Sequence, residues 1–128
     1  MIAHVGIQVR DIEKSKTFYT AALAPLGYQM LREYGVTPSR QAASAGFGEL
    51  PRADFWIYQG EANPVSTHIA FLAKTRDAVD TFHQAAMAAG GKDNGKPGLR
   101  PQYSTNYYAA FILDPDGYNI EAMCREAE

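Results

Sequence analysis

The sequence has little of what marks several large classes of protein. Its 128 residues include a single cysteine, Cys124, which excludes an internal disulfide framework and fits a reducing compartment. The net charge is −2, with acids and bases well mixed, and this argues against nucleic-acid binding. No apolar run approaches the ~18 residues of a membrane span, and the first residues lack the basic segment of a signal peptide. We therefore expect a single cytoplasmic domain over 1–128 that has no nucleic-acid or membrane partner.

What the chain does contain is an internal repeat. Residues 4–27 align on residues 68–91 without a gap, and the alignment pairs His4 with His68. Alanines and glycines also coincide near the end of both segments, and most of the remaining pairs keep their chemical class. The chain therefore reads as two copies of one unit of roughly 60 residues.

Each copy predicts the order β-α-β-β-β and together they predict an α+β fold, with repeat one at about 1–62 and repeat two at about 65–126. A short apolar run opens each copy, and Asp11 and Thr75 then stand where a helix N-cap is expected. Further strands are expected at 28–34, 42–48, 53–59, 106–113 and 118–124. The remaining strand is poorly defined near 99–103, because the glycine- and proline-rich residues 92–102 indicate a loop.

Three residues form a candidate metal-binding set. Glu121 follows the tight-turn residues 114–117 and sits in the otherwise apolar run IEAMC, where a buried carboxylate needs a partner. His4 and His68 open the first strand of each repeat, and two imidazoles with one carboxylate are typical of a site that keeps open coordination positions. Spacing alone leaves the alternative open that both histidines are structural and the glutamate is exposed on the far face.

The segments HVGIQVRDIEKSKTFYTAAL, THIAF and FILDPDGYNIEAM resemble the vicinal oxygen chelate superfamily, over nearly the whole chain. This superfamily includes glyoxalase I, fosfomycin-resistance thiol transferases, extradiol dioxygenases and bleomycin-binding proteins. The resemblance implies paired modules with helices outside and a curled mixed sheet that forms a cup around one divalent metal ion: zinc, nickel, manganese or iron. It implies His4, His68 and Glu121 as the metal ligands.

The same resemblance implies a metal-dependent, glyoxalase-like enzyme, similar to lactoylglutathione lyase, with Glu121 also moving a proton. It implies a homodimer, in which modules pair either within one chain or across two. The resemblance leaves open which reaction is catalysed, because Trp56 stands where glyoxalase I has a second glutamate and Phe111 stands where the fosfomycin enzymes have a tyrosine. An extradiol dioxygenase and a non-catalytic small-molecule binder are further alternatives.

Aromatic and polar side chains are candidates for contacting a small-molecule substrate. Flat rings with a few hydroxyl groups suit an organic ligand, although an aromatic-rich core would explain them equally well. The predicted substrate-binding residues are Trp56, Tyr58, Arg100, Tyr103, Tyr107 and Phe111.

Overall fold

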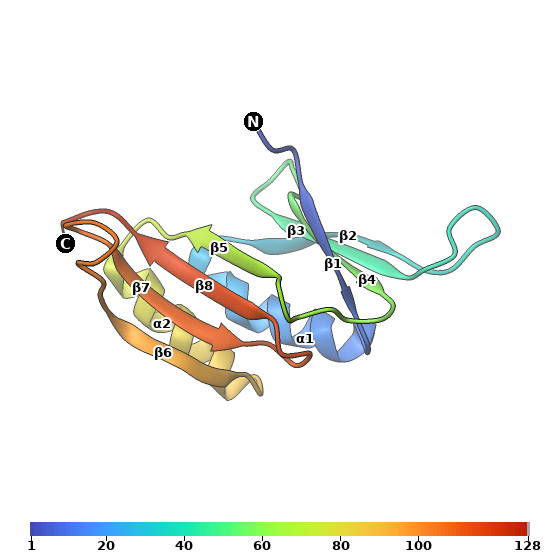
Figure 1. Ribbon diagram of the computed structural model, residues 1–128. Helices are drawn as coiled ribbons and strands as arrows, with labels where there is room; N and C mark the ends of the chain where they lie inside the picture. The colour runs from blue at the N-terminus through green and yellow to red at the C-terminus, as the bar shows by residue number, and fades with distance from the viewer. Residues whose placement is uncertain (128) are drawn as a thin grey trace.

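A computed structural model describes residues 1–127 and contains the strand–helix–three-strand order twice (Figure 1). The first half consists of β1 (Val5–Val9), α1 (Ile12–Leu23), the short 3-10 helix η1 (Ala24–Leu26), β2 (Gln29–Tyr34), β3 (Ser44–Gly48) and β4 (Phe55–Gln59). The second half consists of β5 (His68–Leu72), α2 (Arg76–Ala88), β6 (Lys92–Leu99), β7 (Tyr108–Leu113) and β8 (Asn119–Cys124). The predicted α+β fold of two β-α-β-β-β units is confirmed.

Both helices begin at the predicted caps. The Asp11 side chain accepts a hydrogen bond from the Lys14 backbone N–H at 3.1 Å, and the Thr75 hydroxyl accepts one from Ala78 N–H at 3.0 Å. These bonds satisfy donors that have no partner inside the first turn of a helix. No helix within residues 1–127 is long and apolar enough to cross a membrane.

The eight strands form two separate four-stranded sheets, in the orders β1-β4-β3-β2 and β5-β8-β7-β6. Each sheet is mixed, because its first strand pairs in parallel with its last while the other pairs are antiparallel. No strand within residues 1–127 joins the two sheets into a barrel. Strands β1 and β5 therefore each lie at an edge, with one side free of any strand described in this chain.

Strand β6 corrects one prediction. Residues 92–102 were expected to form a loop and the missing strand to lie near 99–103, yet Lys92–Leu99 pairs with β7 as an edge strand. The pairing register shifts on both sides of Gly95, whose φ is +154°. Glycine and proline weaken a regular strand but are tolerated at edges and bulges. The composition therefore correctly indicated irregular backbone and wrongly indicated the absence of a strand.

Each helix covers one face of its own sheet, and the two helices also contact each other (Figure 1). The buried core on these faces includes Phe18, Phe55, Phe82 and Ile120. Cys124 is also fully buried, as expected for a small apolar residue in a packed strand. The opposite face of each sheet is left without a covering helix, and Trp56, Tyr58 and Glu121 lie on these uncovered faces because they alternate with core residues of β4 and β8.

The turn before β8 ties the second half to the first. The buried Asp114 carboxylate accepts the Tyr19 hydroxyl at 2.5 Å and the backbone N–H of Asp116 and Tyr118 at 2.9 Å each. Burial raises the pKa of Asp114 above its ordinary value, although these donors oppose the shift. The Tyr118 hydroxyl donates to the backbone carbonyl of Gln8 at 2.6 Å. This turn therefore fixes the start of β8 against helix α1 and strand β1.

Candidate metal and ligand site

Glu121 lies in the middle of β8 with 3% of its surface exposed, and both of its carboxylate oxygens have partners. Oε1 lies 2.9 Å from Nε2 of His68, and Oε2 accepts the Tyr107 hydroxyl at 2.5 Å. His68 is at the start of the neighbouring parallel strand β5, and Tyr107 immediately precedes β7 on the other side. The three strands therefore supply the partners that a buried carboxylate requires.

The hydrogen bonding of His68 leaves its Nε2 atom to face the Glu121 carboxylate. Nδ1 lies 3.0 Å from the backbone carbonyl oxygen of Asn119, which can only accept, so Nδ1 carries the proton. A neutral imidazole then directs the lone pair of Nε2 at Glu121 Oε1, only 2.9 Å away. Such a pair needs a proton or a cation between the two atoms. An imidazole oriented by a carbonyl, next to a carboxylate, fits the donor set of a divalent metal ion.

Tyr107 holds the second oxygen of Glu121. Burial, followed by the hydrogen bond to Glu121, raises the pKa of Tyr107 to about 12. The hydroxyl therefore keeps its proton at neutral pH and donates it in the bond to Oε2. Tyr103 packs edge-on against this ring, with 5.1 Å between centroids, and is itself largely exposed.

Phe111 and Arg100 complete the uncovered face of the second sheet. Phe111 lies directly opposite Glu121 in the β7–β8 register, and the His68 ring lies within 24° of parallel to it at 6.1 Å. The Arg100 guanidinium carbon is 5.4 Å from the Phe111 ring centroid. The structure thus gathers the predicted residues Arg100, Tyr103, Tyr107 and Phe111 around the His68–Glu121 pair.

His4 lies apart from this pair in the chain's own fold, just before β1 of the other sheet. Within residues 1–127 no group of three His, Cys, Asp or Glu side chains is placed to hold a metal ion. His4 and His68 nevertheless line the same open cavity of about 340 Å³ between β1 and β5. One chain therefore brings two of the three predicted ligands together, and His4 as the third stays a prediction.

The first sheet carries an indole where the second carries its carboxylate. Trp56 pairs with Gly6 across β4 and β1, and Glu121 pairs with Ala70 across β8 and β5. Gly6 and Ala70 each lie two residues beyond the repeat histidine. The strand register therefore supports the predicted correspondence of Trp56 with Glu121.

Trp56 belongs to a group of three aromatic side chains on this face, which we call the aromatic row: Tyr34, Trp56 and Tyr58. The Trp56 ring is within 5° of parallel to Tyr34 and within 17° of parallel to Tyr58. Sequence reasoning identified Trp56 and Tyr58 but missed Tyr34, which is brought beside them by the pairing of β2 with β3. The signal available was strand alternation, which puts Arg32 and Tyr34 on one face.

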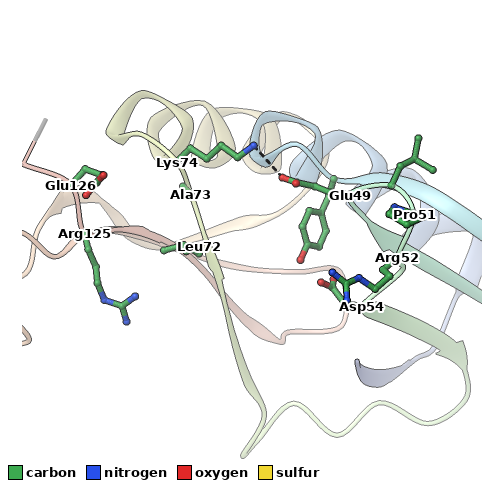
Figure 2. Close-up of a pocket in the computed structure, with 11 residues that line it drawn as sticks. Glu49, Pro51, Arg52, Asp54, Leu72, Ala73, Lys74, Arg125 and Glu126 are labelled. Atoms are coloured by element: carbon green, nitrogen blue, oxygen red, sulfur yellow. Dashed lines mark ion pairs between the residues drawn. The ribbon is translucent and has the colours of Figure 1, made fainter. Parts of the chain in front are cut away.

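A cavity of about 760 Å³ lies elsewhere, along the seam between the two halves (Figure 2). It is bounded by the turn over residues 49–54, the end of β5 and the segment after β8. Lys74 reaches across it to Glu49, with 3.4 Å between Nζ and Oε1. Burial, followed by a hydrogen bond with Asp54, raises the pKa of Tyr28 on its wall. Neither Glu121 nor Trp56 lines this cavity.

Comparison with known proteins identifies the family. The family model of the Glyoxalase/Bleomycin resistance protein/Dioxygenase superfamily matches residues 1–122. The chain belongs to this superfamily. The resemblance drawn from the repeat and the final strand is thereby confirmed.

Relatives in the superfamily share the fold at modest identity. A glyoxalase/bleomycin resistance protein from Albidiferax ferrireducens T118 is 30% identical, with a TM-score of 0.77 over 97% of this chain and 98% of that one. Glyoxalase I from Zea mays shares the fold at 23% identity, with a TM-score of 0.70 over 99% of this chain and 45% of that one. The "Probable lactoylglutathione lyase, chloroplastic" of Arabidopsis thaliana is 27% identical over 95% of this chain. The chain spans 35% of that relative's length and 43% of a Brassica oleracea relative with the same identity.

Proposed function

We propose that the protein is a metal-dependent, glyoxalase-like enzyme acting on a small organic substrate that presents vicinal oxygens. The observation that carries the proposal is the approach of His68 Nε2 to Glu121 Oε1 at 2.9 Å while His68 Nδ1 is committed to Asn119. Membership of the superfamily and the lactoylglutathione lyase names of two relatives support it.

In this proposal His68, Glu121 and a third ligand, His4, hold one divalent ion, which is zinc, nickel, manganese or iron. When bound, the ion supplies positive charge that polarises substrate oxygens and stabilises negative charge developing on them. The Asn119 carbonyl orients the His68 ring, and the Tyr107 hydroxyl holds Glu121 Oε2. Glu121 would accept a proton from the substrate carbon and return it once its carboxylate left the ion.

The third ligand comes, in this proposal, from a second copy of the chain in a homodimer. Strands β1 and β5 are both sheet edges, and an open edge is a template for pairing with another chain. Large apolar side chains are exposed beside these edges: Ile2, Val5 and Leu72. The seam cavity of Figure 2 shares Tyr28, Asp54 and Leu72 with the cavity that His4 and His68 line. A closed interface there would bring His4 of one copy to the His68–Glu121 pair of the other.

Metal analysis of the purified protein tests the metal site. We expect His4→Ala and His68→Ala each to remove the metal, because each deletes one of three ligands. The third histidine of the chain provides the matched control, since His83 of α2 bonds Asp93 of β6, and His83→Ala should retain the metal. Equal metal content in all three variants and the wild type would refute the assignment.

Mixing two defective chains tests where the third ligand comes from. In a site shared between copies, a His4→Ala chain paired with a Glu121→Gln chain leaves one of the two sites intact. Random exchange makes half of the dimers mixed, so about a quarter of the wild-type metal content should return. If each site forms within one chain, both partners are defective and no metal returns.

A second candidate function is supported by the aromatic row. Trp56 occupies the place of a second carboxylate, and three stacked rings suit the sequestration of a flat molecule without catalysis. The metal distinguishes the two functions. A binding protein of this kind should retain its ligand affinity in Glu121→Gln, whereas substrate chelation by the enzyme should be lost with the metal.

A further inference from the structure

The aromatic row presents π surface on the uncovered face of the first sheet. The centroid of the Trp56 ring system lies 6.1 Å from that of Tyr34 and 6.3 Å from that of Tyr58. Tyr34 is 36% exposed, and Trp56 and Tyr58 are partly exposed. Three nearly parallel rings at the surface form an aromatic stack, against which another planar ring can pack.

Gly46 of β3 leaves room for the Trp56 ring because it has no side chain. A Cβ atom at Gly46 would lie 2.8 Å from three atoms of the six-membered ring of Trp56. Gly46 is not among the glycines with positive φ, so its backbone does not demand glycine. The absence of a side chain lets the indole rest against the strand, and Trp56 stays partly exposed.

Two arginines flank the aromatic row. The Arg40 guanidinium carbon lies 3.7 Å from the Tyr34 ring centroid, held there by a Thr37–Arg40 backbone bridge in the β2–β3 loop. Arg32 lies directly opposite Gly46 in the register, so it shares the face of Trp56. Neither arginine forms an ion pair with an acidic side chain in the part of the chain that the structure describes. Flat π surface with unpaired positive charge at its rim is complementary to a flat anion.

We propose that the aromatic row and its two arginines bind a planar aromatic acid. The ring of the acid lies against Trp56, and its carboxylate pairs with Arg40 or Arg32. The inference deepens the proposed function, because it names the class of the substrate, but ring binding itself does not require the metal. A neutral apolar partner is disfavoured, since it would cover the two guanidinium groups without pairing them.

The test uses the one tryptophan of the chain as a reporter. Chelator-treated wild-type protein labelled with ¹⁵N gives a single indole N–H resonance, that of Trp56. Titration with 2-naphthoate should shift this resonance, and calorimetry of the same mixture gives the affinity. Cyclohexanecarboxylate carries the same charge without a flat ring and should bind about tenfold more weakly.

Matched arginine variants test the charge. Arg40→Gln should weaken 2-naphthoate binding about tenfold, since a hydrogen-bonded charge partner is lost. Arg52→Gln is the control, because Arg52 lines the seam cavity instead of the aromatic row, and its affinity should equal that of the wild type.

Three results would overturn the inference. The first is equal affinity for the two acids, and the second is an indole resonance that 2-naphthoate does not move. The third is an indole resonance whose position depends on protein concentration and stays the same when 2-naphthoate is added. That result would mean that a second copy of the chain covers the aromatic row. Because the titration is performed without metal, failure of the metal assignment leaves a positive result standing, and the two proposals fail separately.

Discussion

The two sheets share one strand order, yet their uncovered faces carry different side chains. The contrast is clearest in the row of residues that pair directly across each sheet. In the first sheet this row reads Gly6, Trp56, Gly46 and Arg32, and in the second it reads Ala70, Glu121, Phe111 and Gly95. The first row presents an indole and a guanidinium group, and the second presents a carboxylate beside a phenyl ring.

Between the two sheets, the site residue differs and its neighbours across the sheet differ in size with it. The Trp56 indole fits because Gly46 has no side chain, and a methyl group there would collide with its ring. Glu121 sits between Ala70 and Phe111, where the smaller carboxylate is approached by His68 and Tyr107 instead. Duplication thus supplies two equivalent positions, and the volume of their neighbours decides which side chain each can hold.

The largest expected effect comes from substituting the two matched positions, Glu121 and Trp56, separately. Glu121→Gln should lower metal affinity by more than about 100-fold, because even a group that only hydrogen-bonds a ligand contributes about 10–100-fold. The matched change Trp56→Phe should leave metal affinity unaltered. Competition with a chelator measures both variants. Equal losses in the two would mean that the sheets do not differ in the way proposed.

The glycine beneath the indole gives the next largest effect. Gly46→Ala should lower the free energy of unfolding by about 1–3 kcal/mol, because the new methyl group displaces the Trp56 ring from a packed position. Gly35→Ala is the matched control, since an added Cβ there meets no atom within 4 Å. Urea unfolding followed by tryptophan fluorescence measures both. An unchanged free energy of unfolding in Gly46→Ala would show that the indole is not held against the strand.

A third variant gives both sheets a carboxylate at the matched position. Trp56→Glu puts a carboxylate at the position matched to Glu121, and a further anionic ligand should raise metal affinity about tenfold. The same variant should lose binding of 2-naphthoate, because the aromatic row is interrupted. Calorimetry with the metal alone and with 2-naphthoate alone reads the two effects independently. Unchanged metal affinity would place Trp56 outside reach of the metal site.

The smallest expected effect comes from the hydroxyl that supports Glu121. Tyr107→Phe removes the 2.5 Å hydrogen bond to Oε2 and should weaken metal binding about tenfold. The loss should be constant through neutral and mildly alkaline pH, because the pKa of Tyr107 is raised to about 12 and the hydroxyl stays protonated there. Tyr103→Phe is the control, since Tyr103 contacts Tyr107 only through its ring. A loss that grew across neutral pH would contradict this role.

Much of the fold could be predicted from local signals. The caps at Asp11 and Thr75, the turn ending in Gly117 and most strands follow from side-chain chemistry and periodicity within a few residues. Strand β6 could not be predicted in this way, because glycine and proline read as a loop and only pairing with β7 makes the segment a strand. Arg40 was missed for a similar reason, since a loop turn that no periodicity predicts carries it over Tyr34.

The sequence by itself determined the repeat, the two β-α-β-β-β units and the matching of Trp56 with Glu121, because these follow from residue spacing along the chain. Tertiary structure alone decided that β1 and β5 lie at the edges of separate sheets, so that His68 meets Glu121 while His4 stands apart. The physical reason is the range of the interactions. Caps and periodicity act over one or two turns of backbone, whereas the placement of the sheets depends on the packing of α1 against α2 and on the contact of Asp114 with Tyr19.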